Sequence, residues 1–410
     1  MSNLQGVNIT KGRLGANRLA SNDAISGIII SAVALSAIAL DTPITVYNLK
    51  DVEALGITAE YDATNNVNCY RHLSEFYRMA GEGTELHLML VNRSETMSGI
   101  CEKAKILLPY AKGDIKQLAI AVNPTAEPVM LNGLPSDVYN AIAKAQELAN
   151  WAYQNNMPLN IFLEGYAYGG NASSSANLRA IDNLQADKVS VVIGQDYNYA
   201  KTKTDKAKKY ADVGTVLGVC SKAKVNQNIG ENESFNITNA VKGIWVEPGL
   251  SSHHKNTAVF SDLQTLEDKG YIFGITYAGM AGVRINNDHT CTPVIVDDEN
   301  RVNEHTIAYG RVMNKAVRSL RTAYLPKVKT NWEVDEKTGK LSLGTITALE
   351  DIGDRVFEDM VRRGEITYGK TIINQNSDLI VSKELIISYK IVPRGVIGEI
   401  NGTINLKTQA

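Results

Sequence analysis

Helical and strand-like segments alternate along the chain from about residue 40 to about residue 220, and this order constrains the fold more than any other feature. Residues 137–156 are predicted to form a helix that starts after Ser136 as its N-cap. The strand-like sequence LNIFLEGYAY follows Pro158, and a second strand-like sequence, VSVVIGQDY, follows a polar loop and a helical stretch. This alternation predicts an α/β layer structure.

An apolar run at residues 24–40, AISGIIISAVALSAIAL, needs its own interpretation because it is almost long enough to span a bilayer. It contains three serines and one glycine, and no cluster of Lys or Arg flanks it. We interpret it as a buried strand followed by small core residues, and we expect no direct insertion into a membrane. The polar N-terminus, MSNLQGVNITKGRLG, is not typical of a signal peptide.

The composition narrows the classes of function. The chain has 410 residues, of which 44% are apolar, and this indicates a soluble protein with two or more domains. It carries 42 Lys and Arg against 44 Asp and Glu, so we expect no nucleic-acid partner. The four cysteines lie far apart without a C-x-x-C pair, which argues against a zinc ribbon or a disulfide scaffold. They indicate free thiols in a reducing compartment, in agreement with synthesis in the cytoplasm.

The pattern changes after about residue 270. The sequence YIFGITYAGMAGVRI predicts strands broken by glycines, and residues 310–325 and 349–363 are predicted helices. From Ile366 onward only strands are predicted. We therefore expect a domain boundary between about residue 260 and about residue 280.

The sequence GEITYGKT, from Gly364 to Thr371, matches the phosphate-binding pattern G-x-x-x-x-G-K-[ST]. A working loop of this kind follows a buried strand and precedes a helix, whose N–H groups bind phosphate. Here a predicted helix precedes Gly364, and a β-branched, strand-like segment follows it. We therefore interpret Gly364 as the glycine that ends a helix, and we expect no nucleotide site.

Other patterns do not predict an enzyme. The adjacent pair His253 and His254 would point to opposite sides of an extended segment, and NNDHTCTP is better explained as a polar loop than as a metal site. The sequence GYAYGGN lacks dinucleotide-binding spacing, and no nucleophile elbow or zinc-protease motif is present. We expect no catalytic residue, no metal site and no cofactor.

Both ends of the chain are strand-forming, although most termini are polar and frayed. Near the N-terminus, Val7 and Ile9 alternate with polar residues. In the C-terminal sequence VIGEINGTINLKTQA, one face carries Ile400, Ile404 and Leu406. Ordering each backbone residue costs about 1–2 kcal/mol, and burying each of these three side chains returns only roughly 1.5–3 kcal/mol. The tail therefore needs a sheet edge, either of its own subunit or of a neighbour.

The predicted helix at 310–325 has a basic stripe opposite its apolar face. The stripe consists of Arg311, Lys315, Arg318 and Arg321. In a chain with almost no net charge, such a stripe can contact an acidic partner, or it can be a solvated helix face.

Three stretches resemble the sheath proteins of contractile phage tails, R-type pyocins and related injection systems. They are ALDTPITVYNLKDVEALGI, YRHLSEFYRMAGEGTELHLMLV and YADVGTVLGVCSKAKVNQNIG, and the strand pair that leads to a bare C-terminal strand is also similar. The resemblance covers most of the chain. It implies a non-enzymatic structural subunit in stacked hexameric rings around an inner tube, which contracts to drive that tube. The partners it implies are other sheath subunits, the tube protein, and baseplate and terminator proteins.

The resemblance also implies a two-domain subunit, with an outer α/β domain at residues 25–265 and an inner α+β domain at residues 266–395. Extended strand arms at residues 1–24 and 396–410 would complete sheets of neighbouring subunits, and the basic helix would face the tube. Two alternatives remain open, which are an α/β nucleotide-hydrolysing enzyme that uses residues 364–371 and a non-contractile shell or baseplate protein. The expected location is an assembled phage tail or injection particle.

Overall fold

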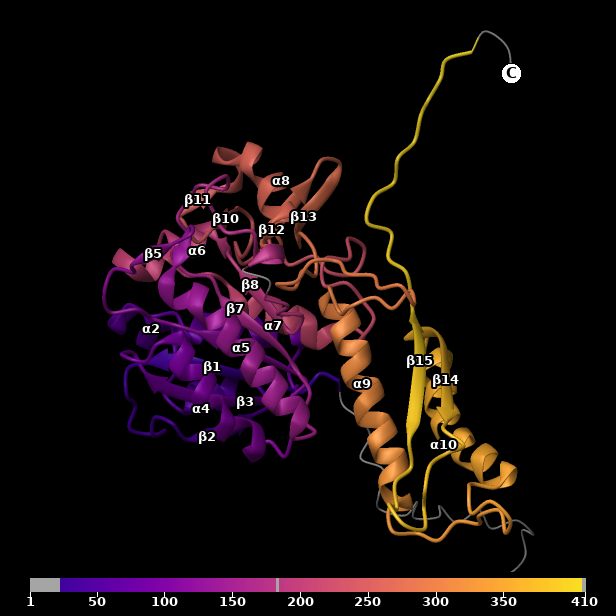
Figure 1. The fold of residues 1–410 in the computed structure, drawn as a ribbon. Coiled ribbons are helices and arrows are strands. Elements are labelled where there is room, and N and C mark those ends of the chain that lie inside the picture. Colours follow the sequence, from indigo (N-terminus) through magenta and orange to yellow (C-terminus); the bar gives the residue numbers. More distant parts are fainter. Residues whose placement is uncertain (1–22, 182–183, 408–410) are drawn as a thin grey trace, which may run out of the picture.

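The protein is built around a six-stranded sheet with the strand order β2-β3-β1-β4-β7-β8, as seen in a computed structural model that describes residues 23–181 and 184–407 (Figure 1). Strands β3, β1, β4, β7 and β8 are parallel, and β2 pairs antiparallel with β3 at one edge. Parallel strands are joined by crossover connections, which are usually helices. This explains why helices and strands alternate along the sequence. The predicted α/β character is confirmed.

The strands are β1 (Ser26–Ala32), β2 (Pro43–Val46), β3 (Leu86–Asn92), β4 (Gln117–Ala121), β5 (Met130–Leu131), β6 (Leu134–Pro135), β7 (Asn160–Glu164), β8 (Val189–Val192), β9 (Gly194–Asp196), β10 (Pro248–Leu250), β11 (His254–Lys255), β12 (Gly274–Tyr277), β13 (Met280–Ile285), β14 (Ile366–Ile373) and β15 (Ile387–Pro393). The α-helices are α1 (Leu49–Ala54), α2 (Ala59–Asn65), α3 (Cys69–Ala80), α4 (Met97–Tyr110), α5 (Ser136–Gln154), α6 (Tyr197–Ala200), α7 (Val213–Lys222), α8 (Phe260–Asp268), α9 (Ile307–Tyr324) and α10 (Leu343–Arg362). Short 3₁₀ turns lie at Leu178–Ala180, Asp205–Lys209, Asn256–Ala258 and Leu325–Lys327.

Residues Ser26–Ala32 of the apolar run form β1 in the middle of the sheet, as predicted. The expectation that the small residues after β1 lie in the core is wrong, because Ala34, Ala37 and Ala39 are exposed. Successive side chains of a strand point to opposite faces, so Ile29 enters one core while Ile28 and Ile30 enter the other. A strand covered on both faces can carry apolar residues at consecutive positions, and this explains the run Ile28-Ile29-Ile30. None of the helices among the described residues is long and apolar enough to cross a membrane.

Helices cover both faces of the sheet. The core on one face takes buried side chains from α4 and α5, such as Leu107 and Ile142. The core on the other face takes them from α3 and α7, such as Phe76 and Leu217. The four cysteines are free and buried, as the spacing predicted.

The C-terminal part of the chain has two smaller cores of its own. The first includes Val312 and Leu320 of α9 with Phe357 and Met360 of α10, and the second includes Leu349 of α10. The antiparallel hairpin β14–β15 packs against α10, and in Figure 1 these elements lie to one side of the six-stranded sheet. The tail beyond β15 then runs away from the rest of the chain (Figure 1).

Three predicted helix boundaries are wrong at their N-termini. Ser136 is the first residue of α5 and makes no cap hydrogen bond, because Pro135 occupies the cap position. The helix predicted from residue 310 begins at Ile307, since Thr306 accepts a hydrogen bond from the N–H of Tyr309. The helix predicted from residue 349 begins at Leu343, where Ser342 is the cap.

Candidate functional site

The C-terminal tail is the most exposed apolar segment that the structure describes. Ile400 is 84% exposed, Ile404 is 96% exposed and Leu406 is fully exposed. Residues 394–407 are in no strand or helix, and this described part of the tail pairs with no other described segment. Among the described residues, the tail is therefore not a last strand in a sheet of its own subunit. The N-terminal residues Val7 and Ile9, predicted to form the other arm, lie outside the described residues.

The hairpin β14–β15 is the nearest sheet before the tail, and it has only two strands. Its inner face is well packed under β14, where Phe357 of α10 lies against Gly369. A Cβ atom at Gly369 would come within 2.4 Å of the Phe357 ring, so only glycine allows this approach. A two-stranded sheet is marginally stable alone, and further strands at its edges would stabilise it.

The phosphate-binding pattern at Gly364 lies in the structural context that was predicted. Helix α10 ends before it, Gly364 has a φ of 71°, and β14 follows. The Nζ atom of Lys370 lies 2.6 Å from the Oδ2 atom of Asp354, so this ammonium has a partner in the chain. No helix N-terminus follows the loop to bind phosphate.

The basic stripe of α9 is not a free surface, and this corrects the expectation from the sequence. Arg311 and Lys315 are buried and Arg318 is half-buried, whereas Arg321 is exposed. Helical periodicity shows which side chains share a face but not what covers that face. Contact with a tube protein therefore remains a prediction for Arg321 alone among the four.

The three covered cations hold α9 to the rest of the chain. Arg311 donates to the carbonyl oxygens of Ala223 and Lys224, which follow α7, at 3.1 and 3.0 Å. Lys315 lies 2.5 Å from both Asp23 and Glu365. Arg318 donates to three carbonyl oxygens at the N-terminal ends of β4 and β7, those of Gly113, Ile115 and Pro158.

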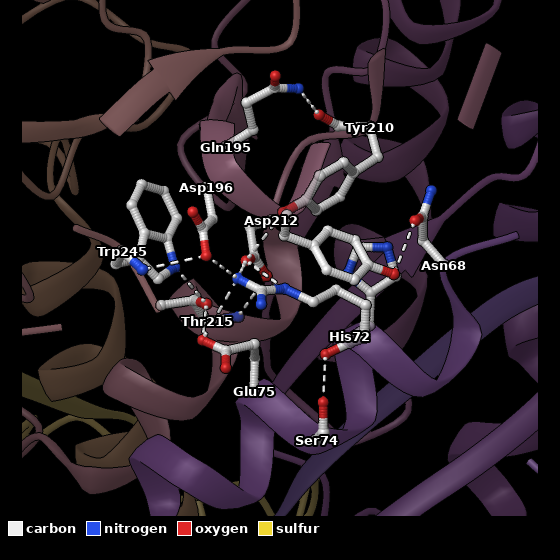
Figure 2. Close-up of polar contacts among 12 residues, drawn as sticks. Asn68, His72, Ser74, Glu75, Gln195, Asp196, Tyr210, Asp212, Thr215 and Trp245 are labelled. Carbon is white, nitrogen blue, oxygen red and sulfur yellow. Dashed lines mark hydrogen bonds and ion pairs between the residues drawn. The ribbon is translucent and has the colours of Figure 1, made fainter. Parts of the chain in front are cut away.

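A buried polar network lies between α3 and α7, and sequence reasoning missed it. The guanidinium of Arg71 lies 2.6 Å from Asp212, 3.3 Å from Asp196 and 3.7 Å from Glu75. All four side chains are at most 6% exposed. In Figure 2 Asp196 and Asp212 lie close to each other, and the carboxylate of Glu75 points toward Thr215.

Two further residues link the network to other segments. The Oγ1 atom of Thr215 donates to Glu75 at 2.9 Å and accepts from the indole N–H of Trp245 at 3.1 Å (Figure 2). The backbone N–H of Trp245 donates to Asp196 at 3.0 Å. Every acidic group of the network has a donor within the chain, so the arrangement joins distant elements of the fold.

Glu164 and His72 form a second buried pair next to this network, with their nearest polar atoms 3.9 Å apart. Burial raises the pKa of Glu164 to about 8 and lowers the pKa of His72 to about 3. Glu164 accepts the backbone N–H groups of Val122 and Ala211, so it joins the end of β4 to the segment before α7.

The close approach of α3 and α7 explains one of the stretches used for the family resemblance, YADVGTVLGVCSKAKVNQNIG. A Cβ atom at Gly214 would lie 2.2 Å from the backbone oxygen of His72, and one at Gly218 would lie 2.7 Å from that of Phe76. Glycines four residues apart on one helix face let two backbones meet. The stretch is therefore a helix-packing element.

Comparisons with known proteins agree with this architecture. Two family models match the chain, "DUF2586, N-terminal domain" over residues 4–289 and "DUF2586, C-terminal domain" over residues 305–410. A search of the curated proteins found no match.

Solved structures of contractile injection systems contain similar chains. One belongs to the six-fold symmetrised baseplate of the anti-feeding prophage (AFP), with 12% identity, a TM-score of 0.61 and complete coverage of both chains. Another belongs to the contracted AFP helical sheath, with 13% identity, a TM-score of 0.57 and complete coverage of both chains. A third belongs to the contracted sheath complex of the extracellular contractile injection system PVC, with 11% identity, a TM-score of 0.56, and coverage of 100% of this chain and 99% of that chain.

The likeness to these structures extends over the whole chain and shows a shared fold, so the resemblance to contractile sheath proteins is confirmed at the level of the fold. The matches to both domain models establish the family more directly. The chain belongs to the DUF2586 family.

Proposed function

We propose that this chain is a structural subunit of a contractile sheath, which polymerises as stacked hexameric rings around an inner tube and contracts to drive it. One observation carries the proposal. In a chain with the fold of sheath proteins, the described tail projects an alternating apolar face that has no partner among the described residues. Exposed apolar side chains do not stabilise a soluble monomer, whereas a polymer can bury them between subunits.

In the proposed assembly, residues 396–410 of one subunit add a strand to the β14–β15 hairpin of a neighbour. Ladder hydrogen bonds contribute about 0.5–1.5 kcal/mol each, and burial of Ile400, Ile404 and Leu406 adds roughly 1.5–3 kcal/mol each. The N-terminal segment 1–24 would form a second arm. Such strand links keep subunits connected while their bodies move between an extended and a contracted packing.

The proposed subunit has two domains, and its division differs from the one expected at residue 265. The cores around the six-stranded sheet include Tyr271, Phe273, Val283 and Ile285, so a cut at 265 would separate residues that pack together. We place the division between β13 and α9. The inner domain then consists of α9, α10 and the β14–β15 hairpin.

The proposed partners are other copies of this chain, the inner tube protein, and baseplate and terminator proteins. The chain needs no nucleotide in this role, because contraction would draw on energy stored during assembly. We propose that it is not an enzyme and that it acts in a phage tail or injection particle.

Negative-stain microscopy of the purified protein, alone and with its tube protein, tests the proposed function. We expect tubes or stacked rings with a cogwheel cross-section. Uniform small particles at high protein concentration, with the tube protein present, would argue against a sheath. A single ring that never stacks would favour a baseplate protein.

A further inference from the structure

The outer edge of β14 is occupied by two carboxylates of α10. The backbone N–H of Thr371 donates to Asp354 Oδ1 at 2.8 Å, and the backbone N–H of Ile373 donates to Glu350 Oε1 at 3.0 Å. In an antiparallel pair, N–H groups point alternately toward the partner strand and away from it. These two residues are separated by one position, so both N–H groups point away from β15 and toward the free edge.

The spacing of the two carboxylates matches the spacing of the two N–H groups. Glu350 and Asp354 are four residues apart on a helix, which is about 6 Å along its axis. Thr371 and Ile373 are two residues apart on a strand, which is about 6.8 Å. A neighbouring strand would present its carbonyl oxygens at this same repeat. The two carboxylates thus stand in the positions that the acceptors of an added strand would take.

A further contact holds one of these carboxylates in place. Lys370 lies 2.6 Å from Asp354 Oδ2, while Asp354 Oδ1 accepts from Thr371. Hydrogen bonds to a charged acceptor are stronger than those between neutral groups.

The edge of β15 is different. The N–H groups of Tyr389 and Ile391, which correspond to Thr371 and Gly369 across the ladder, have no side-chain acceptor in the part of the chain that the structure describes. The hairpin therefore has one closed edge and one open edge.

We propose that Glu350 and Asp354 form an edge guard, which keeps β14 closed to strand addition in the free subunit. The strand that it excludes is the tail of a second copy, residues 399–407, because that segment is extended, apolar on one face and unpaired among the described residues. Unpaired edges invite uncontrolled strand pairing, and charged side chains are a known means to block it. The guard leaves β15 as the edge that a tail meets first. This inference rests on the strand donation proposed above.

The test measures binding of a fluorescent synthetic peptide with the sequence of residues 396–410 to the full-length protein, at protein concentrations below self-association. The guard variant carries Glu350→Ala and Asp354→Ala. We expect it to bind the peptide at least about tenfold more tightly than the wild type, or to bind one more equivalent, because no carboxylate must be displaced.

Two further variants make the result specific. Asp351→Ala with Glu358→Ala removes the same charge from exposed positions of α10, and it should bind like the wild type. Glu350→Gln with Asp354→Asn keeps an acceptor oxygen at each position without charge, and it should bind with intermediate affinity. If the double alanine variant fails to fold, the variant with Glu350→Gln and Asp354→Asn still tests the proposal.

Equal, measurable binding by the wild type and both guard variants would overturn the guard and leave strand donation intact. Absence of binding by every variant up to millimolar peptide would overturn strand donation, and the guard with it.

Discussion

The ammonium of Lys315 in α9 lies 2.5 Å from the carboxylate of Glu365, which stands between α10 and β14. Lys315 is also 2.5 Å from Asp23, at the start of the described chain. A side chain expected to contact another protein thus joins three segments of its own. Both members of the Lys315–Glu365 pair are buried, so loss of one leaves the other without its partner.

Lys315→Ala should lower the free energy of unfolding by about 3–5 kcal/mol, as when a buried ion pair loses one member. Urea unfolding of the variant and the wild type measures this. Lys315→Ala combined with Glu365→Ala should cost less than the sum of the two single changes. The control is Arg321→Ala on the same helix, where the exposed side chain should change stability by at most about 0.5 kcal/mol. If both lysine and arginine variants unfold like the wild type, the ion pair does not stabilise the fold.

Gly214→Ala should destabilise the subunit by about 1–3 kcal/mol or more, because its Cβ would lie 2.2 Å from the backbone oxygen of His72. Backbone cannot move as a flexible side chain can, so α3 and α7 must separate and disturb the Arg71 network between them. Thermal melting measures the effect. Gly344→Ala is the matched helical control, since its Cβ meets nothing closer than 4.0 Å and alanine favours a helix. An unchanged melting temperature in Gly214→Ala would mean that the two helices do not need this close contact.

Deletion of residues 399–410 should abolish ring and tube formation and leave the monomer equally stable. The described part of this segment is exposed and unpaired, so its removal exposes no core. Melting of dilute protein and microscopy at assembly concentrations measure the two effects separately. A more limited variant, Ile400→Asn with Ile404→Asn, keeps the length of the tail and should also prevent assembly. A truncated chain that precipitates, or that loses most of its melting transition, would show that the tail is an internal strand.

The contribution of Glu164 to the free energy of unfolding should fall as the pH rises from about 4.5 to about 8. Its pKa is raised to about 8 by burial, whereas in the unfolded chain it has the ordinary value of 4.5. Between these values the folded state holds a proton that the unfolded state has released, so each rise in pH favours unfolding by at most about 1.4 kcal/mol per pH unit. Urea unfolding over this pH range should give a less negative slope of the unfolding free energy against pH for Glu164→Gln than for the wild type. The exposed control Glu358→Gln should keep the wild-type slope, and an identical slope in all three proteins would contradict the raised pKa.

Much of the fold could be predicted from the sequence because it depends on local patterns. The apolar run at residues 24–40 predicted a buried strand, and β1 is that strand. The order of a helix, then Gly364, then a β-branched segment predicted a helix end in place of a phosphate loop, and the positive φ of Gly364 agrees. These features depend on neighbours in sequence, which a pattern contains.

Only the tertiary structure decided which polar groups meet. The helical pattern placed Arg311 and Lys315 opposite an apolar face, but a polar face can be covered by another part of the same chain as well as by solvent or a partner. Arg71 and Asp212 are 141 residues apart, and no local pattern relates them. In the sequence, Glu350 and Asp354 are only two charged residues of an amphipathic helix. The tertiary structure shows that their carboxylates accept hydrogen bonds from β14. The spacing of apolar and polar residues along a helix or strand determines which residues share a face. The packing of distant segments determines what that face contacts.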